Sequence, residues 1–151
     1  MDAVEDFEDL LMLLESHQVQ YLIVGGLAFI FHAKPRFTKD MDIWVESSPE
    51  NIQRVNLALS EFGSPFLLEL DKPDQVVQLG IAPNRIDFLV EMGPVQFSDA
   101  WSRCVKAPYG AVNTNWIHLD DLEKIKSSIP DPRHQDDAKI LRKVQKRRDR
   151  H

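Results

Sequence analysis

Two aspartates stand two residues apart at the beginning of an apolar run, in the segment "KDMDIWVE". Strands tend to exclude aspartate, so the presence of Asp40 and Asp42 calls for a reason. Side chains at positions i and i+2 of a strand point to the same face, and we therefore expect these two carboxylates to project together. Asp87, in the apolar run "RIDFLV", is a third acid in the same kind of setting.

Converging carboxylates are costly without a cation. Two like charges 4 Å apart repel by roughly 4 kcal/mol at an effective dielectric constant of 20. Hard divalent cations such as Mg²⁺ and Mn²⁺ accept such a set of oxygen ligands. The alternative is that these acids lie in water on an edge strand or a loop. The apolar residues 43–45 make that alternative less favourable and leave it open.

A glycine pair, Gly25 and Gly26, follows the apolar run "VQYLIV". A strand, a glycine turn and a helix can present backbone N–H groups to a phosphate. The pattern lacks the Rossmann glycine fingerprint and the Walker lysine, and a glycine pair after a strand is often only a tight turn. One short helix separates the pair from Asp40. We therefore expect the glycines and the acids to lie at the same end of a sheet.

The chain alternates between helical and strand patterns from end to end. Ser48 with Pro49 predicts a helix start, Asp120 with Glu123 a capping box, and residues 82–84 a hairpin turn. The predicted fold is a single α/β (α+β) domain over 1–151, a mixed sheet packed against helices with two helices at its C-terminal end. We expect helices at 3–16, 27–33, 49–62, 97–105, 120–128 and 132–147, and strands at 19–24, 39–46, 65–70, 75–81, 85–92 and 110–119.

Composition is typical of a soluble globular protein, since 43% of the 151 residues are hydrophobic and 28% are charged. Cys104 is the single cysteine, which excludes an internal disulfide and a four-thiolate zinc site. No apolar run approaches the roughly 20 residues that span a membrane, and the acidic start differs from a signal peptide. We therefore expect a cytoplasmic protein without a membrane partner.

Charge is unevenly distributed along the chain. The net charge is −6, yet residues 139–151 hold seven Lys or Arg and one acid. Residues 1–138 therefore hold 18 − 7 = 11 basic and 24 − 1 = 23 acidic side chains, a net of −12. An acidic body is a poor general binder of nucleic acid. The basic end could contact RNA, although cations at the C-terminal end of a helix are favoured by its dipole alone.

The segment "GGLAFIFHAKPRFTKDMDIWV" resembles the signature of the nucleotidyltransferase superfamily, which has the polymerase-β-like fold. The fuller pattern is similar to small stand-alone bacterial nucleotidyltransferases and to the nucleotidyltransferase parts of toxin–antitoxin systems. The resemblance implies that Gly25 and Gly26 bind the phosphates of a nucleoside triphosphate. It also implies that Asp40, Asp42 and Asp87 are catalytic and hold two Mg²⁺ or Mn²⁺ ions.

Other residues take roles from the same resemblance. Arg36 and Thr38 are candidate nucleotide-binding residues, although Arg36 could pair with an acid of the loop instead and Thr38 could bond a carboxylate or simply favour a strand. The segment "DLEKIKSSIPDPRHQDD" is similar to a downstream motif of a lysine followed by R-x-x-D. This similarity adds Lys126 as a nucleotide-binding candidate, with Arg133 and Asp136 in the remaining positions. His32, at the end of a short apolar helix, is predicted to be structural.

Two functional hypotheses follow from the sequence. The first is an enzyme that transfers a nucleoside monophosphate group from a triphosphate to a hydroxyl of a protein, an RNA or a small molecule. The second is an antitoxin-like or regulatory module that acts by contact with a partner protein. The retention of all three acids favours the first. With 151 residues there is little room for a separate acceptor domain, so a partner or a homodimer could supply acceptor recognition.

Overall fold

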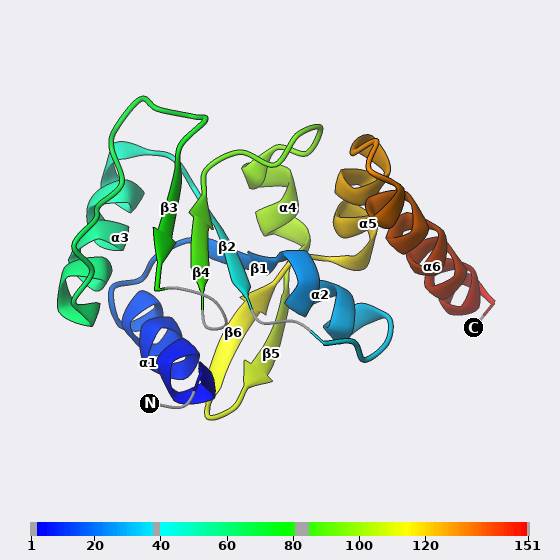
Figure 1. Ribbon diagram of the computed structural model, residues 1–151, viewed down its shortest axis with the longest axis horizontal. Helices are drawn as coiled ribbons and strands as arrows, with labels where there is room; N and C mark the ends of the chain where they lie inside the picture. Colours follow the sequence, from blue (N-terminus) through cyan, green and yellow to red (C-terminus); the bar gives the residue numbers. More distant parts are fainter. Residues whose placement is uncertain (1–2, 38–39, 81–84, 151) are drawn as a thin grey trace.

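The computed structural model describes residues 3–37, 40–80 and 85–150, with side chains from residue 6 onward. Helices and strands alternate up to residue 62, and after it neighbouring strands and then two helices follow each other directly (Figure 1). The helices are α1 (Ala3–Ser16), α2 (Gly25–His32), α3 (Pro49–Phe62), α4 (Phe97–Arg103), α5 (Leu119–Ser128) and α6 (Pro132–Asp149). The strands are β1 (Tyr21–Val24), β2 (Met41–Val45), β3 (Val76–Leu79), β4 (Ile86–Leu89), β5 (Val105–Tyr109) and β6 (Val112–Trp116).

The strands form one mixed sheet in the order β3-β4-β2-β1-β6-β5. β2 runs parallel to β4 and β1 runs parallel to β6, while the other neighbours are antiparallel. The prediction of an α/β mixed sheet packed against helices is confirmed. Because β1 and β2 are antiparallel, the end of β1 lies beside the beginning of β2, and this places the glycines next to the acids.

The two faces of the sheet are covered by different helices. Tyr21 and Val45 lie opposite each other on β1 and β2, and the Tyr21 hydroxyl donates to Glu15 of α1 at 3.0 Å. α3 packs beside α1 on this face. Trp44, one position along β2, points to the other face and meets Phe97 of α4 edge-on, with 5.1 Å between the ring centroids. Asp42 shares the Trp44 face, since the two residues are two positions apart.

Helix α3 begins and ends as its sequence predicts. The Ser48 side chain accepts from the Asn51 amide, Pro49 is the first helical residue and Gly63 closes the helix in the left-handed conformation. Asn51 is buried, and its amide binds the backbone of Gln20 and of Glu46. These hydrogen bonds attach the start of α3 to the chain on either side of the β1–β2 pair.

The prediction of a strand over 65–70 was wrong. This segment is irregular, and its Leu68 backbone binds the side chain of Asn56 through both N–H and C=O. Only Leu68 is buried, whereas Phe66, Leu67 and Leu70 are each about half exposed. An apolar run of this length resembles a buried strand in sequence, but here a side chain of α3 satisfies the backbone that a neighbouring strand would otherwise pair.

Two boundaries near the C-terminal half also differ from the prediction. α4 ends at Arg103, and Val105 begins the edge strand β5, which the sequence analysis missed. β5 contains Pro108. A proline argues against a strand when only the sequence is known, but it is tolerated in a strand at the edge of a sheet. The predicted capping box is wrong as well: the ring of His118 accepts from the Asp120 amide, while Glu123 accepts from Ser127.

The two C-terminal helices are confirmed and lie side by side at one end of the sheet (Figure 1). α6 continues to Asp149, so most of the basic segment 139–151 is helical, with three cations in its last turn. None of the helices in the described ranges is long and apolar enough to cross a membrane. The predicted hairpin turn at 82–84 lies outside the described residues.

Candidate active site

One row of residues crosses the sheet through two of the predicted catalytic acids. Val24 of β1 is the register partner of Asp42 on β2, and Asp42 is the partner of Asp87 on β4. Directly opposed residues on neighbouring strands point to the same face. The sequence placed Asp40 with Asp42 by their spacing, and the parallel pairing of β2 with β4 brings in Asp87 from 45 residues further along.

Gly25 lies directly against the carboxylate of Asp42. The chain leaves β1 at Val24 and starts α2 at once, with a φ of +67° at Gly25. A Cβ atom at this position would lie 2.1 Å from Asp42 Oδ2. The two glycines therefore belong to the first turn of the helix rather than to a turn before it. Only glycine combines this backbone conformation with so close an approach.

Arg85 contacts the other two acids of the group, Asp40 and Asp87. Its Nη2 atom lies 3.2 Å from Asp40 Oδ2 and its Nε atom lies 3.1 Å from Asp87 Oδ1. The contact to Asp40 is a hydrogen bond. The contact to Asp87 is close but poorly directed, because both atoms are buried without a hydrogen-bond partner among the described residues. It is an ion pair in which the Asp87 oxygen keeps an unused lone pair.

The pKa values of the acids show that Arg85 leaves the negative charge only partly balanced. Burial, and then the charges of Asp87 and Asp40, raise the pKa of Asp42 to about 6, against the opposing effects of Arg85 and Lys126. Burial also raises the pKa of Asp87 above its ordinary value, although Arg85 acts in the opposite direction. Groups with raised pKa values in a cluster of like charges are typical of functional sites.

A ready-made metal site is not present in the described part of the chain. No group of three or more acids, histidines or cysteines there is arranged closely enough to hold an ion. Arg85 is part of the reason that no such group is present, because its guanidinium contacts both Asp40 and Asp87. The acids are neighbours, but one of their counterions is a side chain of the protein itself.

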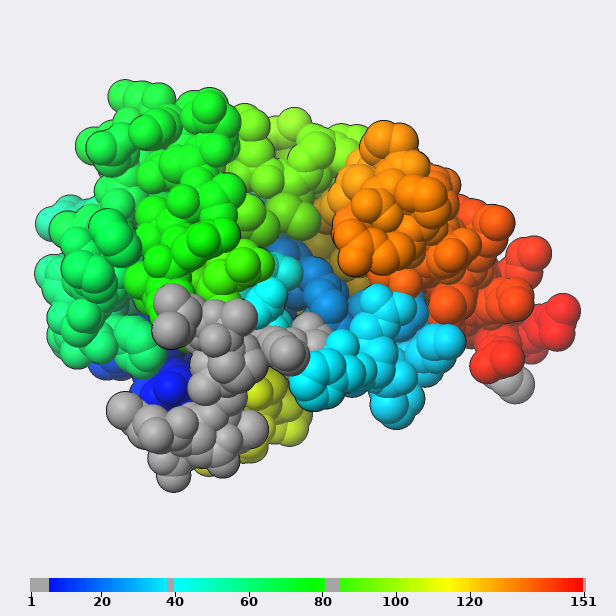
Figure 2. All heavy atoms as spheres, in the orientation of Figure 1, coloured from blue at the N-terminus to red at the C-terminus, as the bar shows by residue number. Residues whose placement is uncertain are grey.

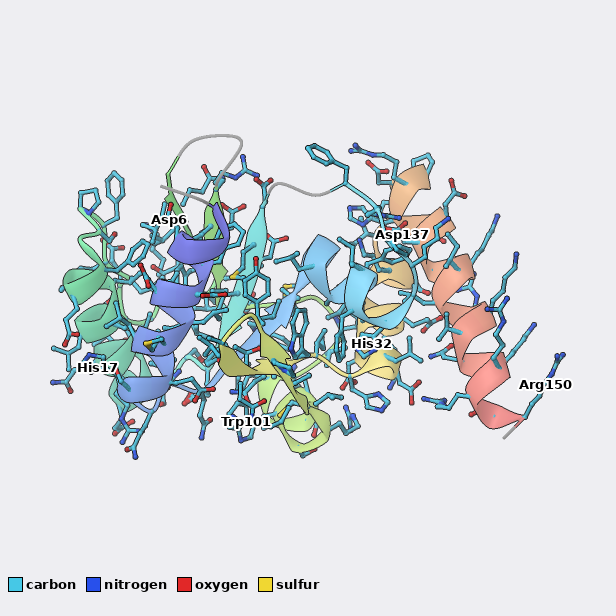
Figure 3. The ribbon with its side chains drawn as sticks, turned by 90° about the horizontal axis from the view of Figure 1, so that it is seen from below. Asp6, His17, His32, Trp101, Asp137 and Arg150 are labelled. Carbon is cyan, nitrogen blue, oxygen red and sulfur yellow. The ribbon has the colours of Figure 1, made fainter. Side chains whose placement is uncertain are left out.

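Arg36 is bound by an acid of the C-terminal helix. Its guanidinium donates to both carboxylate oxygens of Asp137, at 3.1 and 2.5 Å, and lies 3.8 Å above the centre of the Phe29 ring. Asp137 lies where α6 meets the chain segment that follows α2 (Figure 3). The sequence analysis considered a pairing of Arg36 with an acid of the loop, whereas the acid in the structure belongs to α6.

Lys126 shares the same carboxylate. Its Nζ atom lies 3.0 Å from Asp137 Oδ2 and 3.1 Å from His134 Nδ1, and its side chain is buried. Burial works to raise the pKa of Asp137, but the hydrogen bonds from Arg36 and Lys126 prevail and hold it below its ordinary value. The charge of Lys126 also lowers the pKa of Asp42, so this cluster acts on the acids electrostatically.

The sequence analysis missed Asp137 and took its neighbour Asp136 instead. Asp136 is exposed, and Arg133, the other residue of that motif, is exposed and lies 3.5 Å from Asp131. Helical phase was the available signal, because Asp137 lies one turn before the buried Leu141. The buried Lys126 of α5 also needs an anion as its partner, and Asp137 lies on the buried stripe of α6 that faces it.

The remaining predicted residues have simple positions. Nε2 of His32 lies 2.6 Å from the Ile117 carbonyl oxygen, in keeping with a structural role. Thr38 lies outside the described residues.

Figure 2 shows the surface hollowed between α5 and the strands on the β3 side, with atoms from the blue and cyan part of the chain at its floor. A cavity of about 720 Å³ lies away from the acids, between α1 and α3.

Comparison with known proteins gave matches to solved structures alone, since no known protein family and no curated protein match the sequence. The solution structure of the antibiotic-resistance factor ANT(2'')-Ia matches with a TM-score of 0.60 and 14% identity, covering 91% of this chain and 81% of that one. The crystal structure of ANT(2'')-Ia with adenylyl-2''-tobramycin gives 0.58 and 15%, covering 94% and 92%.

The lincosamide antibiotic adenylyltransferase LnuA, with lincomycin bound, matches with a TM-score of 0.61 and 17% identity, covering 93% of this chain and 96% of that one. The chain has a nucleotidyltransferase fold. The likeness extends over almost the whole length of the sequence, while the low identity makes it a statement about the fold alone. Within this nucleotidyltransferase fold, the acids at the start of β2 and β4 are the residues whose chemistry needs an explanation.

Replacement of Gly25 by alanine is expected to displace Asp42, because the new methyl group would overlap its carboxylate. Gly63→Ala is the matched control: Gly63 also has a positive φ, +94°, but faces open space. We expect both variants to lose about 1 kcal/mol or more of unfolding free energy from backbone strain. Only Gly25→Ala should also change the pKa of Asp42, which NMR titration of that carboxyl group measures. An unchanged Asp42 pKa in both variants would contradict the contact with Asp42.

Asp42 makes stability depend on pH in a defined direction. Its pKa is raised to about 6 from 3.8, so between those values the folded state binds more protons than the unfolded state, and stability contributed by this group falls as pH rises. Asp42→Asn should therefore gain stability at pH 7, by up to about 3 kcal/mol, and the gain should vanish near pH 4. Urea denaturation of both proteins across this range measures the difference, with Asp74→Asn as an exposed control.

Asp137 is expected to stabilise the junction between α5, α6 and the segment after α2. Asp137→Asn would leave a buried lysine without its anion, a change that costs roughly 3–5 kcal/mol in comparable buried pairs. Asp136→Asn removes the same charge one residue earlier at an exposed position and should change stability by less than about 0.5 kcal/mol. Chemical denaturation compares the two. Similar losses would show that the cluster contributes little.

Proposed function

We propose that this protein is an enzyme that transfers a nucleoside monophosphate group from a nucleoside triphosphate to a hydroxyl acceptor. The observation that carries the proposal is the pair Asp42 and Asp87, register partners on adjacent parallel strands, with the backbone of Gly25 against one of them. Two adjacent carboxylates with raised pKa values, Asp87 buried and Asp42 half-buried, are maintained by the fold at a cost in stability. A function that requires their charge accounts for that cost.

The residues fit a divalent cation in their chemistry. The donors are carboxylate oxygens, one Asp87 oxygen has no hydrogen-bond partner among the described residues, and the raised pKa of Asp42 marks negative charge that Arg85 does not balance. Asp40, Asp42 and Asp87 would hold Mg²⁺ or Mn²⁺, two ions by the resemblance in sequence. When bound, such ions stabilise the attacking and leaving oxygens of an in-line displacement. Arg85 would have to release Asp40 to admit them.

The residues of the chain then divide the reaction between them. Asp87 accepts the proton of the acceptor hydroxyl, whose oxygen bonds to the α-phosphorus while the bond to pyrophosphate breaks. The triphosphate lies against the backbone of Gly25 and Gly26 at the start of α2, where a helix N-terminus favours negative charge. Arg36 and Lys126 supply positive charge from the adjoining cluster, and Thr38 remains a predicted contact.

ATP and a small-molecule acceptor are the substrates that the similar structures favour. LnuA is an adenylyltransferase with lincomycin bound, and ANT(2'')-Ia was captured with adenylyl-2''-tobramycin. This protein has their fold over almost all of its length. Among the acceptor classes that the sequence left open, a small hydroxyl compound therefore ranks above a protein or an RNA.

A second candidate function is a contact module, similar to an antitoxin, that has the fold without the chemistry. The pairing of Arg85 with Asp40 and Asp87 favours it, because a bound arginine can replace the charge of a metal ion. In that case a partner protein, or a second copy of this chain, would be the ligand. The two candidates differ in what the loss of Asp87 should do.

Asp87→Ala separates them. For an enzyme, the variant should retain most binding of MgATP and lose transfer by about 10²- to 10⁴-fold, because a group that takes the proton acts mainly in the transition state. Labelled ATP, with transfer to lincomycin and to water measured separately, gives the rates, and Asp74→Ala at an exposed position is the control. Unchanged transfer in Asp87→Ala would remove Asp87 from the mechanism. Wild-type protein that neither binds MgATP nor releases pyrophosphate would favour the contact module.

A further inference from the structure

The row of acids continues onto the outer strand of the sheet. Gln78 of β3 is the antiparallel register partner of Asp87, so the two side chains share a face and lie next to each other. Val76, two positions earlier, is on the same face. Both are exposed, and Val76 is 50% accessible. The sheet face beside Asp87 is therefore open to a ligand on the side away from Arg36 and Lys126.

A cavity of about 470 Å³ lies along the edge of the same strand, and Val76, Val77 and Gln78 contribute to its lining. Across from β3 it is lined by Phe66 and Leu67, which are 59% and 49% exposed. The irregular backbone of segment 65–70, wrongly predicted as a strand, is what leaves these two side chains outside the core. An apolar wall with a few polar groups is the usual composition of a small-molecule site.

The polar lining of this cavity is close to neutral in charge. Lys72 Nζ lies 3.3 Å from Glu69 Oε2, so the two charges offset each other. Gln75 is committed to the backbone of Glu69 through two hydrogen bonds. Gln78 is then the polar side chain of the lining that stands next to a candidate catalytic acid. Such a lining suits an uncharged polar compound with an apolar face and offers little to a polyanion.

We propose that the open face and edge of β3, formed by Val76, Gln78, Phe66 and Leu67, bind the acceptor, and that the acceptor is a small amphipathic alcohol rather than a polynucleotide. This inference rests on the proposed function. The cations Arg36 and Lys126 lie beyond Asp42 on one side, where they suit the triphosphate. Gln78 lies beyond Asp87 on the other side, next to the group that takes the acceptor's proton.

The position of the site matches the direction of the reaction. The hydroxyl loses its proton to Asp87, its oxygen forms the new bond to the α-phosphorus, and pyrophosphate leaves with the electrons of the broken P–O bond on the side of Lys126 and Arg36. Gln78 orients the acceptor by a hydrogen bond, and Val76 packs against its apolar part. A sheet face lined in this way holds the nucleoside triphosphate and the acceptor alcohol on opposite sides of the acids.

The test compares three probes as acceptors of labelled AMP from MgATP. n-Octyl β-D-glucopyranoside below its micellar concentration presents sugar hydroxyls with an apolar tail, glycerol presents hydroxyls alone, and an RNA oligonucleotide with a free 3′ end presents a hydroxyl on a polyanion. The variants are Gln78→Ala and Val76→Glu. Gln53→Ala is the matched control, an exposed glutamine that lines a different cavity on α3.

Wild-type protein should use the octyl glucoside at least ~10-fold better than glycerol, as expected when an apolar group occupies a fitted site, and should not use the RNA. Val76→Glu and Gln78→Ala should each lower kcat/KM for the octyl glucoside by ~10-fold or more, mainly through KM. MgATP binding should stay within twofold, because the triphosphate lies on the other side of the acids. Gln53→Ala should match wild type, and melting temperatures confirm that the variants are folded.

Several outcomes would overturn the inference. Preference for RNA, equal use of glycerol and octyl glucoside, or no transfer to any probe by protein that binds and hydrolyses MgATP would each refute the acceptor class. Unchanged kinetics in both variants would refute the site. If Val76→Glu fails to fold, Gln78→Ala alone decides. Wild-type protein that does not bind MgATP would instead refute the proposed function on which this inference rests.

Discussion

The repulsion between neighbouring carboxylates is the constraint to which the rest of this structure responds. Asp42 and Asp87 are register partners on parallel strands, a placement that costs free energy whenever both are ionised. Burial raises the pKa values of both groups, and the charges of Asp87 and Asp40 raise that of Asp42 further. Arg85 relieves some of the repulsion from the start of β4, and Lys126 acts from further away.

Side chains from distant parts of the chain meet around these acids. Gly25 allows α2 to begin against the Asp42 carboxylate, and α2 in turn packs against both C-terminal helices. Asp137 of α6 then binds Arg36 and Lys126 together, so the cations are held by an anion of their own. The electrostatic arrangement places a partly balanced negative group at the centre, positive charge on one side and an uncharged, open strand on the other.

Much of the fold was predictable because local signals and long-range packing agree. The start of α3 at Ser48 and Pro49 and its end at Phe62 are in place as predicted, and the apolar runs of β1, β2 and β4 became the central strands. The failures have physical causes. Segment 65–70 has the composition of a strand, but the Asn56 side chain forms hydrogen bonds with its backbone in place of a neighbouring strand. β5 was missed because it contains Pro108, which an edge strand tolerates.

By itself, the sequence determined that Asp40 and Asp42 share a face, since the spacing of side chains in a strand is a local property. It also placed a glycine pair at the end of the preceding strand. Only the tertiary structure decided which residues complete the group. The parallel pairing of β2 with β4 set Asp87 beside Asp42, and the docking of α6 selected Asp137 over Asp136 as the partner of Arg36. Strand order and helix docking join residues far apart in the chain, and no local pattern encodes them.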